Sequence, residues 1–348
     1  MSGGVDSSVA AALLKEAGHD VVGATLKLWG GASDSGCCSV SDVDDARRVA
    51  QVLDIDHHVF NYTEEFDRHV VAPFIAGYTA GESPNPCIEC NRHIKFDVLF
   101  ERAQRLGFDA VATGHHAQVR QGPNGPELVR GADPAKDQSY VLGYLTSDQL
   151  AQLLLPIGHM NKSDVRAEAE RLGLRTWDKP DSQDVCFIEA SAGREAFLRA
   201  RIPLTTAEIV DEKSGVVIGT TDAAEMMTLG QRKGVLPDRH GEKRFVSRVD
   251  LKARRVSVGR LEDILVSELA LNQASVTFAR REAQSGEDVL VQVSAHGTPL
   301  PGRLVRDEAW RVVFDAPVRP VAAGQSAVFY DVNAPDVVVG AALVASGA

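Results

Sequence analysis

The chain opens with residues 1–8, Met-Ser-Gly-Gly-Val-Asp-Ser-Ser, and continues directly into a segment with helical spacing. Two adjacent glycines allow the backbone to turn with its amide groups pointing inward, and the N-terminus of a following helix adds partial positive charge and free N–H donors. Such a turn makes an anion nest suited to a phosphate. The stretch has no Gly-Lys-Ser/Thr sequence, so it is not the loop of NTPases that cleave the γ-phosphate. The alternative is a Gly turn before a helix capped by Asp and Ser.

Working outward from this stretch, segments of helical and strand character alternate up to residue 113. The pattern predicts helices over 7–17, 41–53, 63–78 and 91–106, strands over 21–28, 57–61 and 109–113, and a Pro-rich loop over 82–90. Alternating strands and helices predict a parallel sheet covered on both faces. A phosphate loop normally follows a buried strand. We therefore expect the natural chain to begin upstream, and a loop without that strand to be held less firmly.

The pattern changes near Ile202, where short apolar stretches are separated by Gly, Asp and Pro. These stretches, 207–210, 215–218, 244–249 and 256–258, predict a small β-rich domain. Longer, alternating strands follow over 274–278, 289–293, 311–314, 325–330 and 337–344, which predicts a β-barrel or sandwich. We expect three domains, with boundaries at 1–200, 201–263 and 264–348.

The composition is that of an ordinary globular protein. The 348 residues include 44% hydrophobic and 24% charged residues, and the formal charge is 37 − 48 = −11. This charge argues against nucleic-acid binding by the whole surface and leaves room for a local basic patch. We find no apolar stretch of membrane-spanning length and no secretory signal pattern. Five cysteines, an odd number, indicate cytosolic thiols. We therefore expect a cytoplasmic protein that binds no membrane.

Three of the cysteines stand in polar surroundings that indicate chemistry. Cys87 and Cys90 form a Cys-x-x-Cys pair in the Pro-rich loop, and Cys186 follows an acidic, polar stretch. We expect Cys90 to end the loop and precede a helix, whose dipole would lower the pKa of its thiol. Cys37 and Cys38 are interpreted as small buried hydrophobes.

The opening stretch resembles the signature of the PP-loop ATP pyrophosphatases, which adenylate a substrate and release pyrophosphate. Six further motifs narrow this resemblance to the tRNA-specific 2-thiouridylases. They are PNPCIECNRHIKF (84–96), ATGHHA (112–117), KDQSYVL (136–142), DSQDVCFI (181–188), TLGQRKG (228–234) and GQSAVFY (324–330). The motifs occur in the family's order and cover nearly the whole chain. The implied fold is α/β: a parallel-sheet PP-loop domain of the adenine-nucleotide hydrolase-like type, then a small β-rich domain and a C-terminal β-barrel.

The resemblance implies that ATP adenylates the C2 oxygen of the wobble uridine of tRNA, and that a cysteine persulfide then supplies sulfur. Cys186 matches the persulfide-carrying cysteine and Cys90 the partner nucleophile. The ATP-binding positions implied are Ser2, Gly3, Gly4, Asp6, Ser7, Ser8, Leu26 and Gly114, with Asp6 positioning the loop or Mg²⁺. Those implied to meet the target base or tRNA are Asn85, Pro86, Cys87, His115, Lys136, Asp137, Gln138 and Gln325.

Several alternatives stay open at this point. Cys87, Cys90 and Cys186 could instead hold a [4Fe–4S] cluster, since cysteine ligation is its general requirement. Relatives often carry Asp at the position of Cys87, so the acid or base of the reaction is open. Arg232 and Lys233 are a plausible phosphate grip, and His116 is given no role. Two rival functions are a ligase that adenylates a small carboxylate or amide, and a nucleotide sensor. The resemblance implies tRNAs for glutamate, glutamine and lysine as partners, with a sulfur carrier or a cysteine desulfurase.

Overall fold

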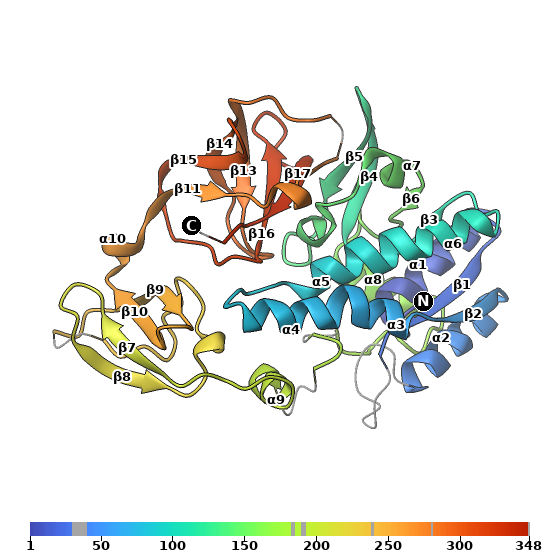
Figure 1. Ribbon diagram of the computed structural model, residues 1–348. Coiled ribbons are helices and arrows are strands. Elements are labelled where there is room, and N and C mark those ends of the chain that lie inside the picture. Colours follow the sequence, from blue (N-terminus) through green and yellow to red (C-terminus); the bar gives the residue numbers. More distant parts are fainter. Residues whose placement is uncertain (30–39, 182–184, 189–192, 238–239, 280, 347–348) are drawn as a thin grey trace.

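The computed structural model describes residues 1–29, 40–181, 185–188, 193–237, 240–279 and 281–346. Its three parts follow one another along the chain (Figure 1). The predictions for Cys37 and Cys38 fall outside the described residues.

The first part begins with the predicted alternation of helix and strand. Its elements are α1 (Val5–Glu16), β1 (Val22–Lys27), α2 (Val40–Leu53) and β2 (Asp56–Asn61). β1 and β2 pair in parallel, with Leu26 opposite Phe60. β3 (Val111–Ala112) pairs in parallel with β6 (Leu153–Leu154). The parallel strands are therefore confirmed, but among the described residues they form two separate pairs, not one sheet.

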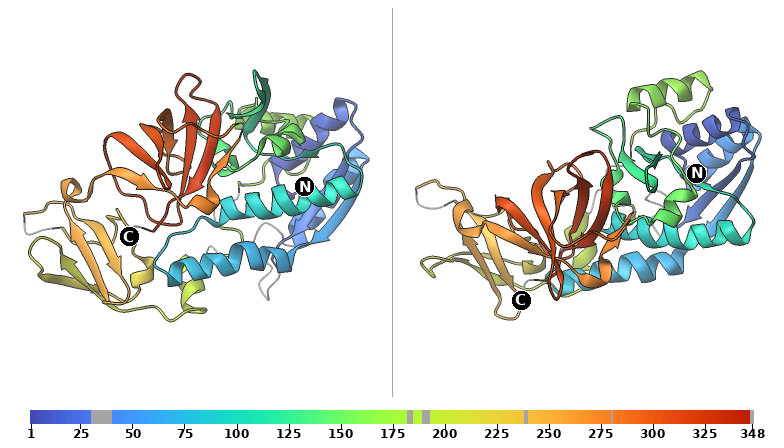
Figure 2. Two further views of the ribbon diagram at one scale, coloured as in Figure 1. Left: turned by 45° about the horizontal axis from the view of Figure 1, so that its top comes forward. Right: turned by 90° about the horizontal axis from the view of Figure 1, so that it is seen from above.

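Two long helical runs lie side by side across this part (Figures 1 and 2). The first consists of α3 (Thr63–Phe66), the π-helical segment η1 (Asp67–Val71) and α4 (Ala72–Thr79). The second consists of α5 (Pro86–Glu89), the π-helical segment η2 (Cys90–Val98) and α6 (Leu99–Arg105). Such π-helical turns are rare and occur frequently at functional sites.

The second run corrects the loop predicted over 82–90. The helix begins at Pro86 because the Asn85 side chain caps it, accepting hydrogen bonds from the backbone amides of Cys87 and Ile88. Proline at the first helical position completes a normal helix start. Cys87 therefore lies in the first turn, where the helix dipole acts. Cys90 lies one turn further in, so the dipole argument made for its thiol was wrong.

The first part is completed by a hairpin and shorter helices. β4 (Ala117–Gly122) and β5 (Gly125–Arg130) form an antiparallel hairpin that the sequence pattern did not predict. The helical elements that follow are η3 (Ser139–Leu142), α7 (Ser147–Ala151), α8 (Lys162–Arg171) and α9 (Gly193–Arg199). α8 packs against α1, and this contact brings its first residues close to the opening loop.

The middle part is a small sheet with its own core. Its strands are β7 (Ala207–Asp211), β8 (Val217–Thr221), β9 (Phe245–Asp250) and β10 (Arg255–Gly259), in the order β8-β7-β10-β9. Only β7 and β10 pair in parallel. Apolar side chains such as Val246, Val256 and Val258 are fully buried between the strands and the 3₁₀ turn η4 (Ala224–Met226). α10 (Leu261–Ile264) leads into the last part.

The C-terminal part is a curled, seven-stranded antiparallel sheet. Its strands are β11 (Val266–Ala270), β12 (Thr277–Phe278), β13 (Glu287–Gln292), β14 (Leu300–Arg306), β15 (Trp310–Val318), β16 (Ser326–Asp331) and β17 (Val338–Leu343), in the order β11-β15-β14-β13-β16-β17-β12. A bridge between Leu271 and Val344 brings the end of β11 to the end of β17 and closes the curl. The strand predicted over 274–278 starts only at Thr277, because the Asn272 side chain accepts from the Ala274 amide and stabilises the turn η5 (Gln273–Ser275).

The barrel and the first part share a hydrophobic core. The hydroxyl groups of Tyr140 and Tyr144 reach Ser326 of β16, 2.9 Å from its carbonyl oxygen and 3.0 Å from its hydroxyl oxygen. The Arg130 guanidinium lies 3.8 Å from the ring centre of Tyr330. Buried tyrosines normally have a hydrogen-bond partner, and here Ser326 of the barrel is the partner of both Tyr140 and Tyr144 of the first part. The two parts are therefore packed as one body.

Candidate active site

The opening loop is a tight glycine turn at the N-terminus of α1. Gly4 is the N-cap of α1, and Gly3 has a φ of +72°, a left-handed conformation that glycine adopts without strain. A Cβ on Gly3 would lie 2.3 Å from the carbonyl oxygen of Asp42, so no larger residue fits there. Ser7 Oγ accepts from the Ser2 amide at 3.0 Å, and Ser8 Oγ donates to the Gly4 carbonyl at 2.8 Å. The serines thus fix the turn ahead of the helix N-terminus.

Two neighbours hold the loop from outside. Gly114 lies so close that a Cβ there would be 2.6 Å from both the Asp6 carbonyl carbon and the Ser7 nitrogen. Lys179 donates to the Gly3 carbonyl at 3.0 Å and to Asp42 Oδ1 at 2.7 Å. Leu26, the residue predicted beside adenine, is half-buried on β1.

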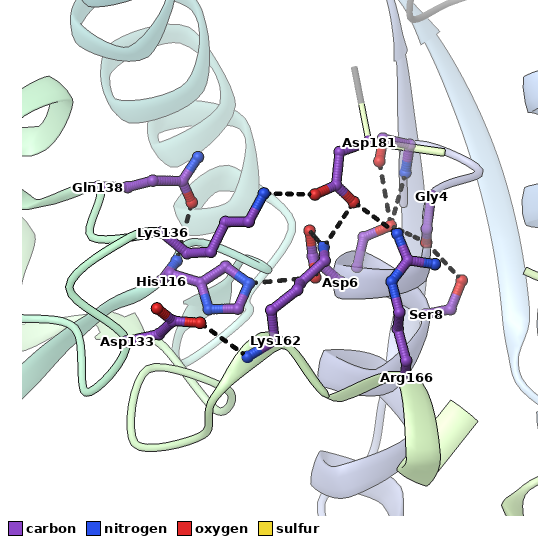
Figure 3. A network of polar contacts seen from close by, with 12 residues as sticks. Gly4, Asp6, Ser8, His116, Asp133, Lys136, Gln138, Lys162, Arg166 and Asp181 are labelled. Carbon is purple, nitrogen blue, oxygen red and sulfur yellow. Dashed lines mark hydrogen bonds and ion pairs between the residues drawn. The ribbon is translucent and has the colours of Figure 1, made fainter. Parts of the chain in front are cut away.

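A cluster of charged side chains surrounds Asp6 (Figure 3). Lys162 at the start of α8 places Nζ 2.6 and 2.7 Å from the two Asp6 carboxylate oxygens and 3.0 Å from Asp181 Oδ1. Asp181 also accepts from Arg166 at 2.9 Å and from Lys136 at 2.8 Å. Three cations therefore converge on two carboxylates beside the loop, and these cations could bind a phosphate chain.

Both carboxylates of this cluster remain ionised at neutral pH. Burial raises the pKa of Asp6, but hydrogen bonds from His116 and Lys162 outweigh burial and bring it below its ordinary value. Burial also raises the pKa of Asp181, but hydrogen bonds from Lys136 and Lys162 lower it to about 2. Opposite charges and hydrogen bonds to the charged form thus dominate over desolvation.

The two neighbouring histidines differ in their surroundings. His116 Nε2 lies 3.2 Å from Asp6 Oδ1, and its amide donates to Gln138 Oε1 at 2.8 Å. His115 is 7% exposed and lies between Thr113 and Lys95, with its Nε2 3.4 Å from Lys95 Nζ. Burial and the Lys95 charge hold the pKa of His115 well below its ordinary value, so this ring is neutral. His116, for which the sequence predicted no role, is the histidine that contacts the loop.

The segment predicted to meet tRNA, residues 136–138, is built into the charged cluster. Lys136 binds Asp181, and Gln138 binds the His116 amide. Asp137 accepts from Arg130 at 2.8 Å and from the Gly131 amide at 2.9 Å. This segment therefore connects the barrel side, through Arg130, to the opening loop.

A second region predicted from the sequence lies around Ser83, just before the capped helix start. Gln325 Nε2 donates to the Ser83 carbonyl, and the Ser83 amide donates to the Ala323 carbonyl at 2.8 Å. Ser83 Oγ lies 3.3 Å from Thr228 Oγ1 of the middle part. The loop that leads into Asn85, Pro86 and Cys87 is therefore in contact with all three parts of the chain.

Two of the cysteines belong to one hydrophobic cluster. Cys90 is 8% exposed within it, and Cys186 is half-buried against it. Phe187 fixes this arrangement through edge-on contacts with Phe66 and Phe74, at ring-centre distances of 5.7 and 5.4 Å. Cys87 is exposed. Within the described ranges, no three Cys, His, Asp or Glu side chains are grouped as a metal ion would require.

The charged side chains of this candidate site that the sequence did not single out are Lys162, Arg166 and Lys179. Their spacing carries a weak signal, because Lys162 and Arg166 stand four residues apart on one face of α8. Asp181 was quoted within a motif but received no role. Nothing local to these residues indicates that they meet Asp6, which lies 156 positions before Lys162.

Comparisons with known proteins match three separate ranges of the chain to family models. Family models match residues 1–190 as "tRNA methyl transferase HUP domain", 195–260 as "tRNA methyl transferase PRC-barrel domain" and 267–344 as "Aminomethyltransferase beta-barrel domain". No helix in the described segments is long and apolar enough to cross a membrane.

Relatives that align over nearly the whole chain are named "tRNA-specific 2-thiouridylase MnmA". The protein of Acidothermus cellulolyticus is 44% identical over 339 residues, covering 95% of this chain and 92% of the relative. That of Salinispora tropica is 44% identical over 356 residues, covering 99% and 98%. That of Clostridium botulinum is 39% identical over 350 residues, covering 99% and 96%. A solved NMN synthetase from Francisella tularensis matches 52% of this chain and 64% of its own at 22% identity, with a TM-score of 0.34.

Proposed function

This chain belongs to the tRNA-specific 2-thiouridylase family, and we propose that it replaces the C2 oxygen of the wobble uridine of tRNA by sulfur at the expense of ATP. The observation that carries this proposal is the pairing of an anion nest with two cysteines on one hydrophobic cluster. The family models are described as methyl transferases, whereas the full-length relatives are named for thiolation. The two cysteines that share one hydrophobic cluster support the sulfur chemistry.

We propose that the opening loop holds the β- and γ-phosphates of ATP. The helix N-terminus and the Gly3–Gly4 turn supply N–H donors, and Lys162, Arg166 and Lys136 supply positive charge. Asp6 offers the hard oxygen donors that Mg²⁺ prefers. Mg²⁺ bound there with ATP would neutralise phosphate charge. Gly114 and Leu26 remain proposed contacts of the nucleotide.

In the first half of the reaction, the uridine C2 oxygen attacks the α-phosphorus and pyrophosphate leaves. The product carries AMP on that oxygen, which makes the oxygen a good leaving group. We propose that Asn85, Pro86 and Cys87 face the target base from the capped helix start. Gln325 supports this loop through Ser83, and His115 and the segment 136–138 are proposed to lie on the tRNA side of the nucleotide site. A base in an anticodon loop can be splayed from its stack for such chemistry.

In the second half, a persulfide on Cys186 supplies the sulfur. Either its terminal sulfur attacks C2 and expels AMP, after which the Cys90 thiolate attacks the Cys186 sulfur; or Cys90 attacks first and releases sulfide, which then attacks C2. Both routes leave a Cys90–Cys186 disulfide, which an external thiol reduces. The shared hydrophobic cluster supports a reaction between these two residues.

We propose tRNAs for glutamate, glutamine and lysine as substrates, and a sulfur carrier or a cysteine desulfurase as the donor. The division into domains at 1–200, 201–263 and 264–348 is proposed with them. A [4Fe–4S] cluster on Cys87, Cys90 and Cys186 is the alternative to the persulfide route, and iron analysis of anaerobically purified protein distinguishes the two.

The deciding experiment measures pyrophosphate release with ATP, Mg²⁺ and unmodified glutamate tRNA, beside the same tRNA with cytidine at the wobble position. We expect release with uridine only. With a sulfur donor added, mass spectrometry of the nucleosides should show replacement of oxygen by sulfur and no methyl group. Pyrophosphate release that does not depend on the wobble base would favour the ligase. So would pyrophosphate release with a small carboxylate and no RNA. ATP binding without release on any substrate would favour the sensor.

A further inference from the structure

The Cys-x-x-Cys pair contains one thiol on the surface and one in the interior. Cys87 is exposed, whereas Cys90 is only 8% exposed. The chain neighbours of Cys87, Pro86 and Ile88, are both buried, so Cys87 is the exposed residue of this turn between two inward-facing ones. The proposed reaction ends with a disulfide between Cys90 and Cys186, and it assigns no sulfur chemistry to Cys87.

The backbone holds the two cysteines of this pair at disulfide distance. The Cys90 amide donates to the carbonyl oxygens of Pro86 and Cys87, so residues 87–90 form one tight helical turn. Residues three positions apart on a helix have Cα atoms about 5 Å apart, and disulfides join Cα atoms about 4.4–6.8 Å apart. A bond between Cys87 and Cys90 therefore needs no rearrangement of the backbone.

The turn that carries Cys87 is fixed by its flanking residues. The Asn85 side chain accepts from the amides of Cys87 and Ile88 at 3.1 and 3.4 Å. The preceding loop is bonded to the barrel through Ser83. The thiolate is the form of cysteine that attacks a disulfide, and the first turn of a helix favours it. Cys87 is therefore well placed to attack the sulfur of Cys90.

We propose that Cys87 is a second resolving thiol, which takes the disulfide over from Cys186 and brings it to the surface of the protein. The inference rests on the proposed function, in which sulfur transfer leaves a bond between Cys90 and Cys186. The Cys87 thiolate attacks Cys90 Sγ, the Cys87–Cys90 bond forms and the bond to Cys186 breaks. Cys186 leaves as a thiolate and is ready for the next persulfide sulfur. This exchange needs no oxidant or reductant.

An external dithiol then acts on the exposed sulfur. One of its thiols attacks Cys87 Sγ and forms a mixed disulfide, and Cys90 leaves as a thiolate and takes up a proton. The second thiol of the reductant closes its own disulfide and releases Cys87. Two electrons and two protons thus pass from the dithiol to the cysteine pair. Because the attacked sulfur lies at the surface, a protein dithiol can serve as the reductant.

The first test maps disulfides during one turnover of the unaltered chain. Protein loaded with sulfur by a cysteine desulfurase is mixed with ATP, Mg²⁺ and unmodified glutamate tRNA, without reductant. Samples are quenched, alkylated and digested with trypsin. Cys87 and Cys90 share one peptide between Arg68 and Arg92, so their bond is internal to it, whereas a bond to Cys186 joins two peptides. We expect the joined peptides first, and then their replacement by the internal disulfide.

The second test separates this relay from a part of Cys87 in proton transfer. Cys87→Ser removes the relay, and Cys87→Asp also removes it but supplies a carboxylate for proton transfer. The readout is the rate of later turnovers divided by that of the first, so that any change in the first turnover cancels. With thioredoxin as the reductant, this ratio should fall by about tenfold or more in both variants, because attack from solution replaces attack by a tethered thiol. Dithiothreitol in excess should restore the ratio, since it is small enough to reach the buried sulfur.

Three results would overturn the relay. They are a Cys90–Cys186 bond that persists while Cys87 is fully alkylated, an unchanged ratio in Cys87→Ser, and recovery of the ratio in Cys87→Asp. Sulfur found in the tRNA nucleosides without any internal disulfide refutes the relay and leaves the proposed function standing.

The cysteine pair is also tested without tRNA. In Cys186→Ser protein kept in a glutathione redox buffer, the internal disulfide between Cys87 and Cys90 should form, and its absence would overturn the relay. A chain that forms this disulfide and never thiolates tRNA refutes the proposed function, while the pairing of the two cysteines stands.

Discussion

Lys162 Nζ lies 2.6 and 2.7 Å from the two carboxylate oxygens of Asp6, and the side chain of Lys162 is only 11% exposed. A residue of α8 thus fixes the carboxylate in the phosphate loop across the interface between α1 and α8. Loop geometry and charge are set together, because the same ammonium group also contacts Asp181. The predictions below begin from this pair.

Replacing Lys162 by Met should leave two carboxylates facing each other without their shared cation. We expect the free energy of unfolding to fall by about 3 kcal/mol, the typical cost of breaking a buried ion pair. ATP binding should weaken as well. Urea denaturation and calorimetry measure the two effects. Lys252→Met, at an exposed site, is the control. In the double variant with Asp6→Asn part of the lost stability should return; strictly additive effects would refute the pairing.

Gly3→Ala should abolish ATP binding while Gly18→Ala should not. Both glycines have positive φ, of +72° and +86°, and alanine there costs about 1–2 kcal/mol. Only at Gly3 does the added Cβ meet a backbone atom, the Asp42 carbonyl oxygen at 2.3 Å; at Gly18 nothing lies within 4 Å. Thermal melts should therefore show a similar loss of stability from backbone strain in both variants. Gly3→Ala should lose further stability from the contact with Asp42. Equal ATP affinities in the two variants would contradict the assigned nest.

The cysteine variants should separate the two halves of the reaction. Adenylation needs no thiol, so Cys186→Ser and Cys90→Ser should still release pyrophosphate with tRNA. Formation of 2-thiouridine should fall by about six orders of magnitude in each variant, as for loss of a catalytic nucleophile. Cys87→Ser tests whether the exposed thiol has any part in proton transfer. Thiolation that survives in Cys186→Ser would remove the persulfide route.

The free energy of unfolding should fall as rising pH removes the proton from His93. Hydrogen bonds that the His93 ring donates to the carboxylates of Asp97 and Glu89 raise the pKa of His93 to about 9, against burial. A raised folded-state pKa contributes stability that is complete below the unfolded value of 6.5 and is lost as pH rises through 9. With Asp97 half-exposed, we expect a loss of roughly 1–2 kcal/mol over this window.

Urea midpoints between pH 6 and 9.5 measure this effect, with those limits chosen to bracket the window of about 6.5 to 9. His93→Gln should flatten the slope, and His19→Gln, at an exposed position, should keep it. A slope that persists in His93→Gln would assign the titration to another group.

The local features of the fold and site followed from the sequence. The phosphate turn, α1, β1 and β2 are encoded by glycines, helical spacing and β-branched runs within short windows. The start of the helix at Pro86 also had a local signal, Asn followed by Pro, but the run of prolines was interpreted as loop. The first three residues of the strand predicted over 274–278 failed for a similar reason, since the cap by Asn272 outweighed the apolar pattern.

The long-range features did not follow from the sequence. Lys162, Arg166 and Asp181 read as ordinary helix and loop charges, and only tertiary folding brings them to Asp6. The internal contacts of Asp137 with Arg130 and Gly131 are equally invisible to local pattern. Periodicity reports which face of an element is buried, but it carries no information on which distant charge will lie opposite.

The contacts at Ser83 bear on how such a chain can evolve. Its amide, carbonyl and hydroxyl each meet a different neighbour: Ala323, Gln325 and Thr228. The three parts of the chain are therefore not interchangeable modules. A barrel borrowed from another protein would have to offer both a carbonyl acceptor and an amide donor at that single loop, in the right register. The backbone and hydroxyl contacts of Ser83 thus restrict recombination of whole domains. We therefore expect the three parts to be inherited as one unit.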